Sequence, residues 1–316
     1  MKNIFYHRRK IKLLGLFLAL FVVACSKEEA ALTPTQTPEK TFTIPQGNHS
    51  YDTRIVNYFN RFGSYILYKY TDQDIKWNVT FNDSFYKTVQ ADTNYVDKQL
   101  DLLDQTFFKY YQDSTLRNYL PVKFFLCSSL RSSTYTQEIN TYMVSSPSTE
   151  TATVSLISQG GYQSFAVNWG RSDILNIKTK NNIDSTIIFK NDVNFSFLKM
   201  AIVNSKMTVS ADFLNTSDYT SSLSVLAPAR YARGFLANTS GMPDKNVDWY
   251  SYLRAITSTS YTDLTNATTP ANDTSYKGIL NSLKDPNGLI KKKYNFIINH
   301  YRNKYNIDLQ AIGNNQ

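Results

Sequence analysis

The stretch from Asp192 to Met207, DVNFSFLKMAIVNSKM, constrains the fold more than any other part of the chain. Its apolar residues recur at helical spacing on two adjoining faces. They are Phe195, Leu198 and Ile202 on one face and Val193, Phe197 and Ala201 on the next. A helix that is apolar on most sides lies in a core, so we expect a central buried helix here, capped by Asp192 or Asn194.

The first 25 residues have the pattern of a bacterial export signal. Basic residues between Lys2 and Lys12 precede an apolar run, Leu13 to Val23, that is too short to span a bilayer. The run ends in Val-Val-Ala-Cys, which resembles a lipobox in which the Cys25 thiol takes the lipid. The alternative is an ordinary signal peptide with a chance cysteine. Cleavage before Cys25 removes five basic residues and lowers the net charge from +9 to about +4, which gives no case for nucleic-acid binding.

A short charged segment, Ser26 to Glu29, follows the cysteine directly. It resembles the export signal of Bacteroidetes lipoproteins that are displayed on the outer face of the outer membrane. A solvated charged tether is the alternative interpretation. The next residues are rich in Thr, Pro and Gln and cannot build a core, so they predict an extended spacer up to about residue 50.

The remaining residues predict an α+β domain with a small mixed sheet. Expected helices are Asp52–Phe62, Thr93–Tyr111, a short one capped by Ser114, Pro228–Ala237, Asn246–Thr257, Lys277–Leu283 and Leu289–Tyr305. Expected strands are Ser64–Tyr70, a short one near Trp77 and Val79, Val122–Ser128, Thr151–Ser158, Phe165–Trp169, Asp173–Ile177 and Thr186–Phe189. The apolar run Val122–Ser128 is expected at the centre of the sheet.

Few residues offer nucleophilic or metal-binding chemistry. Cys127 ends the central strand and is expected to be a packed small side chain, with a catalytic thiol as the alternative. His49 lies at the expected disordered edge of the domain. His300 is expected at the surface or packed, and a Ser-His-Asp arrangement has no matching nucleophile motif. The run Lys291–Lys293 predicts a solvated helix face, with a lipid-headgroup or partner contact as the alternative.

The order of these parts resembles the zinc-binding metallopeptidase lipoproteins of Bacteroidetes, also described as substrate import-associated zinc metallohydrolase lipoproteins. Its most specific parts are YRNKYNIDL, Tyr301 to Leu309, and ARGFLANTSG, Ala232 to Gly241. The resemblance implies a zincin-like fold whose central helix carries HExxH, with two histidines on one face that grip zinc and a glutamate as general base.

This chain departs from the family at that motif. The best register places Lys199 and Val203 at the histidine positions and Met200 at the glutamate position. Downstream, Asp248 is retained, whereas Val247 and Ser251 replace glutamates of the acidic segment. No catalytic, cofactor-binding or metal-binding residue is therefore carried over, and the expected cofactor is none.

Two functions remain open. The first is a non-catalytic accessory or binding lipoprotein, a pseudoenzyme with a glycan or peptide ligand, which the resemblance associates with a TonB-dependent transporter and its lid lipoprotein. The second is an active metallohydrolase or peptidase. The predicted organisation is a signal peptide over residues 1–24, an acylated Cys25 and tether over residues 25–50, and a single zincin-like domain over residues 51–316.

Overall fold

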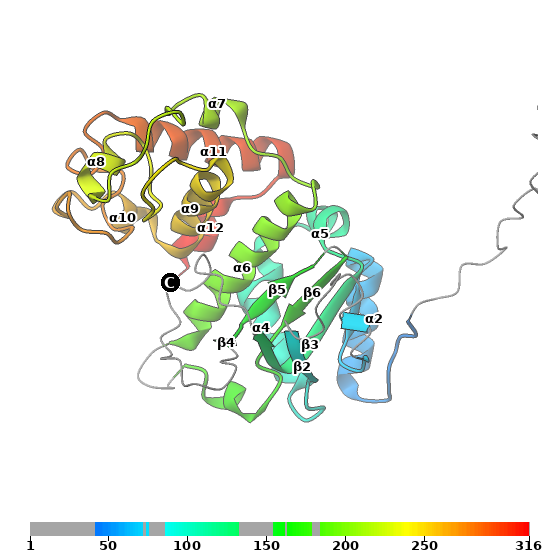
Figure 1. Cartoon of the computed structure of the whole chain (residues 1–316). Coiled ribbons are helices and arrows are strands. Elements are labelled where there is room, and N and C mark those ends of the chain that lie inside the picture. The colour runs from blue at the N-terminus through cyan, green and yellow to red at the C-terminus, as the bar shows by residue number, and fades with distance from the viewer. Residues whose placement is uncertain are drawn as a thin grey trace, which may run out of the picture. The chain divides into compact units, whose positions relative to one another are not determined.

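The computed structural model describes residues 42–71, 74–75, 86–132, 154–161, 163–178 and 184–315 (Figure 1). Its contacts divide the chain into residues 1–42 and a compact unit of residues 43–316. Every helix and strand named below belongs to the second unit. Within the described ranges, no helix combines the length and the apolar character needed to cross a membrane.

The described residues form a mixed α+β structure. The strands are β1 (Tyr65–Leu67), β2 (Tyr86–Gln90), β3 (Lys123–Ser132), β4 (Val154–Ser155), β5 (Ser158–Gly160) and β6 (Ser164–Val167). The helices of the first half are α2 (Ser50–Phe62), α4 (Val96–Thr106), η1 (Phe108–Tyr110), α5 (Asp113–Tyr119) and η2 (Ser172–Asn176). The later helices are α6 (Ser185–Val203), α7 (Ala211–Leu214), α8 (Ala227–Tyr231), α9 (Lys245–Ser258), α10 (Tyr261–Leu264), α11 (Leu289–Tyr305) and α12 (Leu309–Asn314).

Strand β3 organises the sheet, as the apolar run of the sequence predicted. Its first half lies parallel to β1 on one side and to β6 on the other, so that Phe124 is opposite both Ile66 and Phe165. Its second half continues as a ribbon and pairs antiparallel with β2 and β4. Strand β5 is antiparallel to β6 and lies at the end of the order β1-β3-β6-β5.

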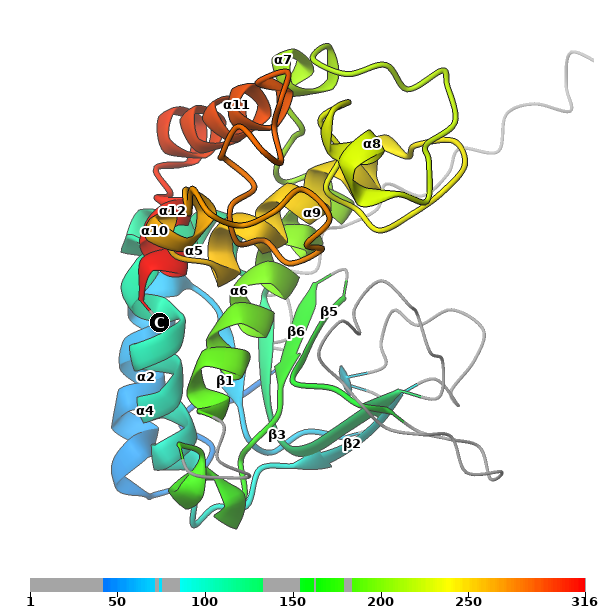
Figure 2. The same cartoon turned by 90° about the vertical axis from the view of Figure 1, so that its left-hand side faces the viewer.

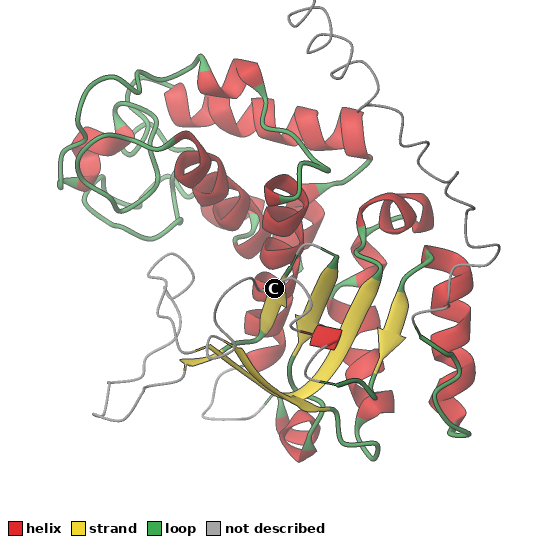
Figure 3. Cartoon of the chain, turned by 45° about the vertical axis from the view of Figure 1, so that its right-hand side comes forward, coloured by secondary structure: helices red, strands yellow, loops and turns green. Residues whose placement is uncertain are grey.

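One face of the sheet is covered by α2, α4 and α6 (Figures 2 and 3). Side chains alternate between the two faces along each strand, and residues directly opposite on neighbouring strands point to the same face. Phe124 and Phe165 are opposite each other, so both point to the covered face. The ring of Phe107, at the end of α4, lies 6.2 Å from Phe124, 6.3 Å from Phe165 and 5.3 Å from Phe197 of α6. These four rings join the two helices to the sheet.

Helix α6 is the predicted central helix, but its bounds differ from the prediction. It begins at Ser185 and ends at Val203, and Asp184 caps it by accepting a hydrogen bond from the Thr186 N–H at 2.9 Å. Neither proposed cap residue serves this purpose. The strand predicted over Thr186–Phe189 is instead the first turn of α6. Its β-branched residues favour a strand, whereas the cap and burial in the core favour the helix.

Two buried polar residues tie α6 to its neighbours. Asn194 donates to the Thr106 carbonyl at 2.8 Å and accepts a hydrogen bond from the Tyr111 hydroxyl, also at 2.8 Å. Lys190 donates to the Ile312 carbonyl of α12 at 2.8 Å. Burial lowers the pKa of Lys190 to about 8. The ammonium group is nevertheless paired, because it donates hydrogen bonds to the carbonyls of Ile312 and Asn315. Pairing of this kind is what makes buried polar groups tolerable.

Helices α7 to α11 gather beside one end of α6 (Figures 1 and 2). Trp249 of α9 is fully buried among them, with the Phe213 ring 4.8 Å and the Tyr301 ring 6.0 Å from its own ring. The predictions for α9 and α11 are confirmed, and the bounds of α11 agree with the prediction at both ends.

Several other predictions are wrong. Residues predicted as the strand Asp173–Ile177 form η2, and the predicted helix Lys277–Leu283 is a series of turns. Helix α8 is shorter than predicted, because Gly234 has a φ of 79° and ends any helical continuation. The strand near Trp77 and Val79, the tether up to residue 41 and Cys25 lie outside the described residues.

Candidate functional site

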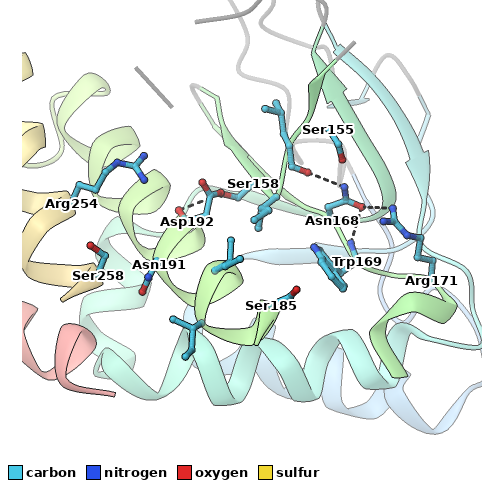
Figure 4. Close-up of a pocket in the computed structure, with 14 residues that line it drawn as sticks. Ser155, Ser158, Asn168, Trp169, Arg171, Ser185, Asn191, Asp192, Arg254 and Ser258 are labelled. Carbon is cyan, nitrogen blue, oxygen red and sulfur yellow. Dashed lines mark hydrogen bonds between the residues drawn. The ribbon is translucent and has the colours of Figure 1, made fainter. Parts of the chain in front are cut away.

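A pocket of about 430 Å³ lies between α6, α9 and the segments on either side of the β5–β6 hairpin (Figure 4). Its lining residues are Ser155, Leu156, Ile157, Ser158, Asn168, Trp169, Arg171, Ser185, Ile187, Ile188, Asn191, Asp192, Arg254 and Ser258. The volume falls within the range of about 300–1,000 Å³ that is usual for small-ligand sites. Most of the lining surface is apolar, although nine of the fourteen lining residues are polar or charged.

Asp192 and Ser158 form one polar contact of the pocket. The Ser158 hydroxyl donates to Asp192 Oδ2 at 2.6 Å, which joins strand β5 to helix α6. Burial raises the pKa of Asp192, while the Ser158 hydrogen bond and the positive charge of Arg254 offset part of that rise. The carboxyl group is therefore protonated at a higher pH than an exposed aspartate would be.

Arg254 reaches into the pocket from α9 (Figure 4). Its guanidinium carbon lies 3.9 Å from the centre of the Phe195 ring, which fixes the side chain by a cation–π contact. The residue is only 7% exposed, and its Nη2 is buried without a hydrogen-bond partner among the described residues. A buried cation without such a partner is unusual and is typical of a binding site.

The third side of the pocket is the turn after β6. Asn168 donates to the Leu156 carbonyl at 2.8 Å and accepts a hydrogen bond from the Trp169 N–H at 2.7 Å. Trp169 has a φ of 84°, in the left-handed region that costs a non-glycine residue about 1–3 kcal/mol. Arg171 donates to the Ser128 carbonyl at 2.8 Å. Three hydrogen bonds therefore hold this part of the pocket wall, which includes one aromatic residue with a strained backbone.

The degenerate motif positions do not line this pocket. The Lys199 ammonium lies 5.2 Å from the centre of the Tyr250 ring, Met200 is buried, and Val203 is 64% exposed at the end of α6. The pocket instead meets α6 about two to three turns before Lys199, at Ile188 and Asp192. Lys199, Met200 and Val203 therefore do not converge on one chemical site.

Asp248 also lies away from the pocket, in the core of the C-terminal helices. Its Oδ2 accepts a hydrogen bond from Lys293 at 2.7 Å, and both side chains are essentially unexposed. Lys293 also donates to the Gly234 carbonyl at 3.0 Å, and its ammonium lies 4.3 Å from the centre of the Phe235 ring. The predicted solvated face of the run Lys291–Lys293 is therefore wrong at Lys293, because that position faces the aromatic core.

The residues present do not fit a zinc site. A catalytic zinc needs about three protein ligands. The pocket lining contains neither histidine nor cysteine, and the described residues contain no group of three potential ligands. His49 precedes α2 as its N-cap and stacks on Tyr51 at 4.8 Å, so it is not at a disordered edge as expected.

The other two candidate ligands are also occupied elsewhere. His300 Nε2 lies 2.7 Å from the Thr208 carbonyl. Cys127 is fully buried, as predicted, and burial raises the pKa of its thiol to about 12. A thiol with so high a pKa is a poor nucleophile and a poor metal ligand near neutral pH.

Comparisons with known proteins found a similar solved structure but no match among family models or curated proteins. No family model matches the sequence. No curated protein matches it either. The crystal structure of a "putative zinc-binding metallo-peptidase" from Bacteroides caccae is similar with a TM-score of 0.43 and 12% identity, covering 84% of this chain and 91% of that chain.

The residues that make the pocket could not be predicted from the sequence as one site. Ser158, Asp192 and Arg254 come from a strand and two helices that are far apart in the chain. The one local signal is Arg254 itself, a lone cation among the apolar residues at the end of helix α9. Trp169 gave no signal, because its backbone conformation cannot be read from the sequence.

Proposed function

We propose that the chain is a surface-exposed, lipid-anchored outer-membrane protein that serves as a non-catalytic binding component of a TonB-dependent nutrient uptake system. The lipobox that ends in Cys25 and the charged residues after it support the location. The resemblance to the metallohydrolase lipoproteins supports the association with uptake. The transporter and its lid lipoprotein are the proposed partners.

The observation that carries the proposed binding role is the composition of the pocket against α6. It combines a hydrogen-bonded wall, four aliphatic side chains and a buried arginine, Arg254, whose Nη2 has no partner among the described residues. These are features of a site that holds a ligand. The same pocket lacks the ligands that a hydrolytic metal requires, which favours binding over metal-dependent hydrolysis.

We propose further that the fold is zincin-like, with α6 in the position of the metal-binding helix of that fold. The arrangement of α6 beside a short mixed sheet with an antiparallel edge strand, β5, supports this assignment. In this proposal the family scaffold is retained, while the residues that would bind and activate a metal have been replaced.

Cell fractionation tests the proposed location. The wild-type protein is expected in the outer-membrane fraction and accessible to protease added to intact cells. The Cys25→Ala variant is expected to be unacylated and released from membranes, with Cys127→Ala as the matched control that stays anchored. A Cys25→Ala variant that still fractionates as a lipoprotein would refute the anchor, and a wild type protected from protease would refute surface display.

A further inference from the structure

We infer that the pocket between β5, α6 and α9 takes a carboxylic acid with an apolar body, and that Arg254 binds the carboxylate. The inference rests on the proposed function and deepens it by giving the class of ligand. It depends on three observations: a guanidinium that no described residue pairs, the separate engagement of Asp192, and the four aliphatic residues of the lining.

The guanidinium of Arg254 is the strongest of these. The side chain is nine-tenths buried, stacks on Phe195, and makes no hydrogen bond or ion pair with any described residue. A buried cation is costly unless an anion pairs with it. The planar guanidinium presents parallel N–H donors that match the two oxygens of a carboxylate. A ligand carboxylate would therefore satisfy a group that the described residues leave open.

Asp192 lines the same pocket and is a candidate partner within the chain, but its carboxylate is hydrogen-bonded to Ser158. Its Oδ2 accepts a hydrogen bond from the Ser158 hydroxyl at 2.6 Å, and no ion pair joins it to Arg254 in the described part of the chain. Figure 4 shows the Asp192 carboxyl and the Arg254 guanidinium on either side of one part of the cavity. The positive charge of Arg254 lowers the pKa of Asp192, and both residues line the same pocket.

The apolar residues of the lining indicate what kind of body is attached to the carboxylate. Leu156, Ile157, Ile187 and Ile188 all line the pocket, and Trp169 adds an aromatic surface. Apolar walls contribute affinity through burial of apolar ligand surface and oppose a strongly hydrated body such as a uronic acid. An aliphatic acid and the C-terminal residue of a peptide both present a carboxylate beside an apolar group. They share the chemistry that the pocket recognises, and only binding data distinguish them.

Calorimetric titration of the full mature chain, made soluble by Cys25→Ser, tests the inference. The probes are 4-methylpentanoate, its amide 4-methylpentanamide, the tripeptide Ala-Ala-Leu, the same tripeptide with an amidated C-terminus, and glucuronate. Each acid with an apolar body is expected to bind roughly ten- to a hundredfold more tightly than its amide, as charge-assisted hydrogen bonds would give. Tighter binding of the tripeptide than of 4-methylpentanoate would identify a peptide end as the source.

Two variants assign the effect to the named residues. Arg254→Met should abolish the preference for the acid over the amide. It should also leave thermal stability equal or raised, because it removes an unpaired buried charge, and this control separates lost binding from lost folding. Asp192→Asn should tighten acid binding, because it removes a negative charge near the carboxylate. Unchanged acid binding in Arg254→Met would overturn the assignment.

The outcomes also separate this inference from the proposed function. Equal binding of acid and amide would overturn the carboxylate assignment, and binding of glucuronate alone would overturn the apolar body of the ligand; in both cases the pocket remains a binding site. Failure of every probe to bind would also overturn it. The proposed function fails on different results, namely metal-dependent cleavage of peptides by the wild type or absence of the protein from the cell surface.

Discussion

Replacement of Lys293 by methionine should destabilise the protein far more than replacement of its neighbour Lys291. The Lys293 ammonium and the Asp248 carboxylate lie 2.7 Å apart, with side-chain exposures of 0% and 1%. At an effective dielectric constant near 20, this separation corresponds to an attraction of roughly 6 kcal/mol. Desolvation of both charges offsets much of this attraction, so the intact pair itself contributes little net stability.

Removal of one partner has a different consequence, because it leaves the other charge buried and uncompensated. Losses of about 3–5 kcal/mol are typical for this change. Tyr219 still donates a hydrogen bond to Asp248, so we expect Lys293→Met to lie at the lower end of that range. Lys291 is exposed on the same helix, and Lys291→Met should change the free energy of unfolding by less than about 0.5 kcal/mol.

Urea denaturation followed by tryptophan fluorescence measures these changes, since Trp249 lies in the same core. The double variant Lys293→Met with Asp248→Asn should recover much of the lost stability, because no buried charge remains. Burial raises the pKa of Asp248 and Lys293 lowers it, so without Lys293 the carboxyl group protonates more readily. The loss in Lys293→Met should therefore shrink as the pH falls. A loss below about 1 kcal/mol, or no recovery in the double variant, would refute the reasoning.

Two further predictions concern single residues. Burial raises the pKa of the Cys127 thiol from 9.0 to about 12, so the folded state holds the proton more tightly than the unfolded state. The stability that this provides is fully present below pH 9.0 and is lost as the pH rises toward 12, and the difference in unfolding free energy between wild type and Cys127→Ala should fall over that interval. A pH-independent difference would contradict this. Asp184→Ala should cost about 1 kcal/mol by removing the N-cap of α6, whereas Asp212→Ala, an exposed first-turn residue of α7, serves as the control and should cost less. Equal losses in urea denaturation would argue against the cap.

The sequence predicted those parts of the fold that depend on local periodicity. Helix α11 repeats apolar residues at helical spacing over its whole length, and the first half of β3 contains an apolar run at residues 124–127, so both were identified. The first turn of α6 was missed, because Thr186, Ile187 and Ile188 favour a strand when considered alone. Burial in the core favours the helix at these residues, and that burial depends on residues distant in the sequence.

The candidate site was predictable to a smaller extent, for the same reason. Lys293 belongs to a run of lysines that usually indicates a solvated face, and its partner Asp248 lies on a different helix. Arg254, Asp192 and Ser158 meet only because α9, α6 and β5 pack together. No spacing rule connects three such elements, whereas HExxH can be recognised because its residues share one turn of one helix.

The zinc content of the purified mature chain tests the central claim most directly. The Cys25→Ser protein is incubated with excess zinc, freed of unbound metal by gel filtration, and measured by elemental analysis together with a peptide-cleavage assay with and without chelator. We expect no stoichiometric zinc and no metal-dependent cleavage, because neither the pocket lining nor the motif positions Lys199, Met200 and Val203 supply a ligand set. One zinc per chain, with cleavage that is lost on chelation, would contradict the account.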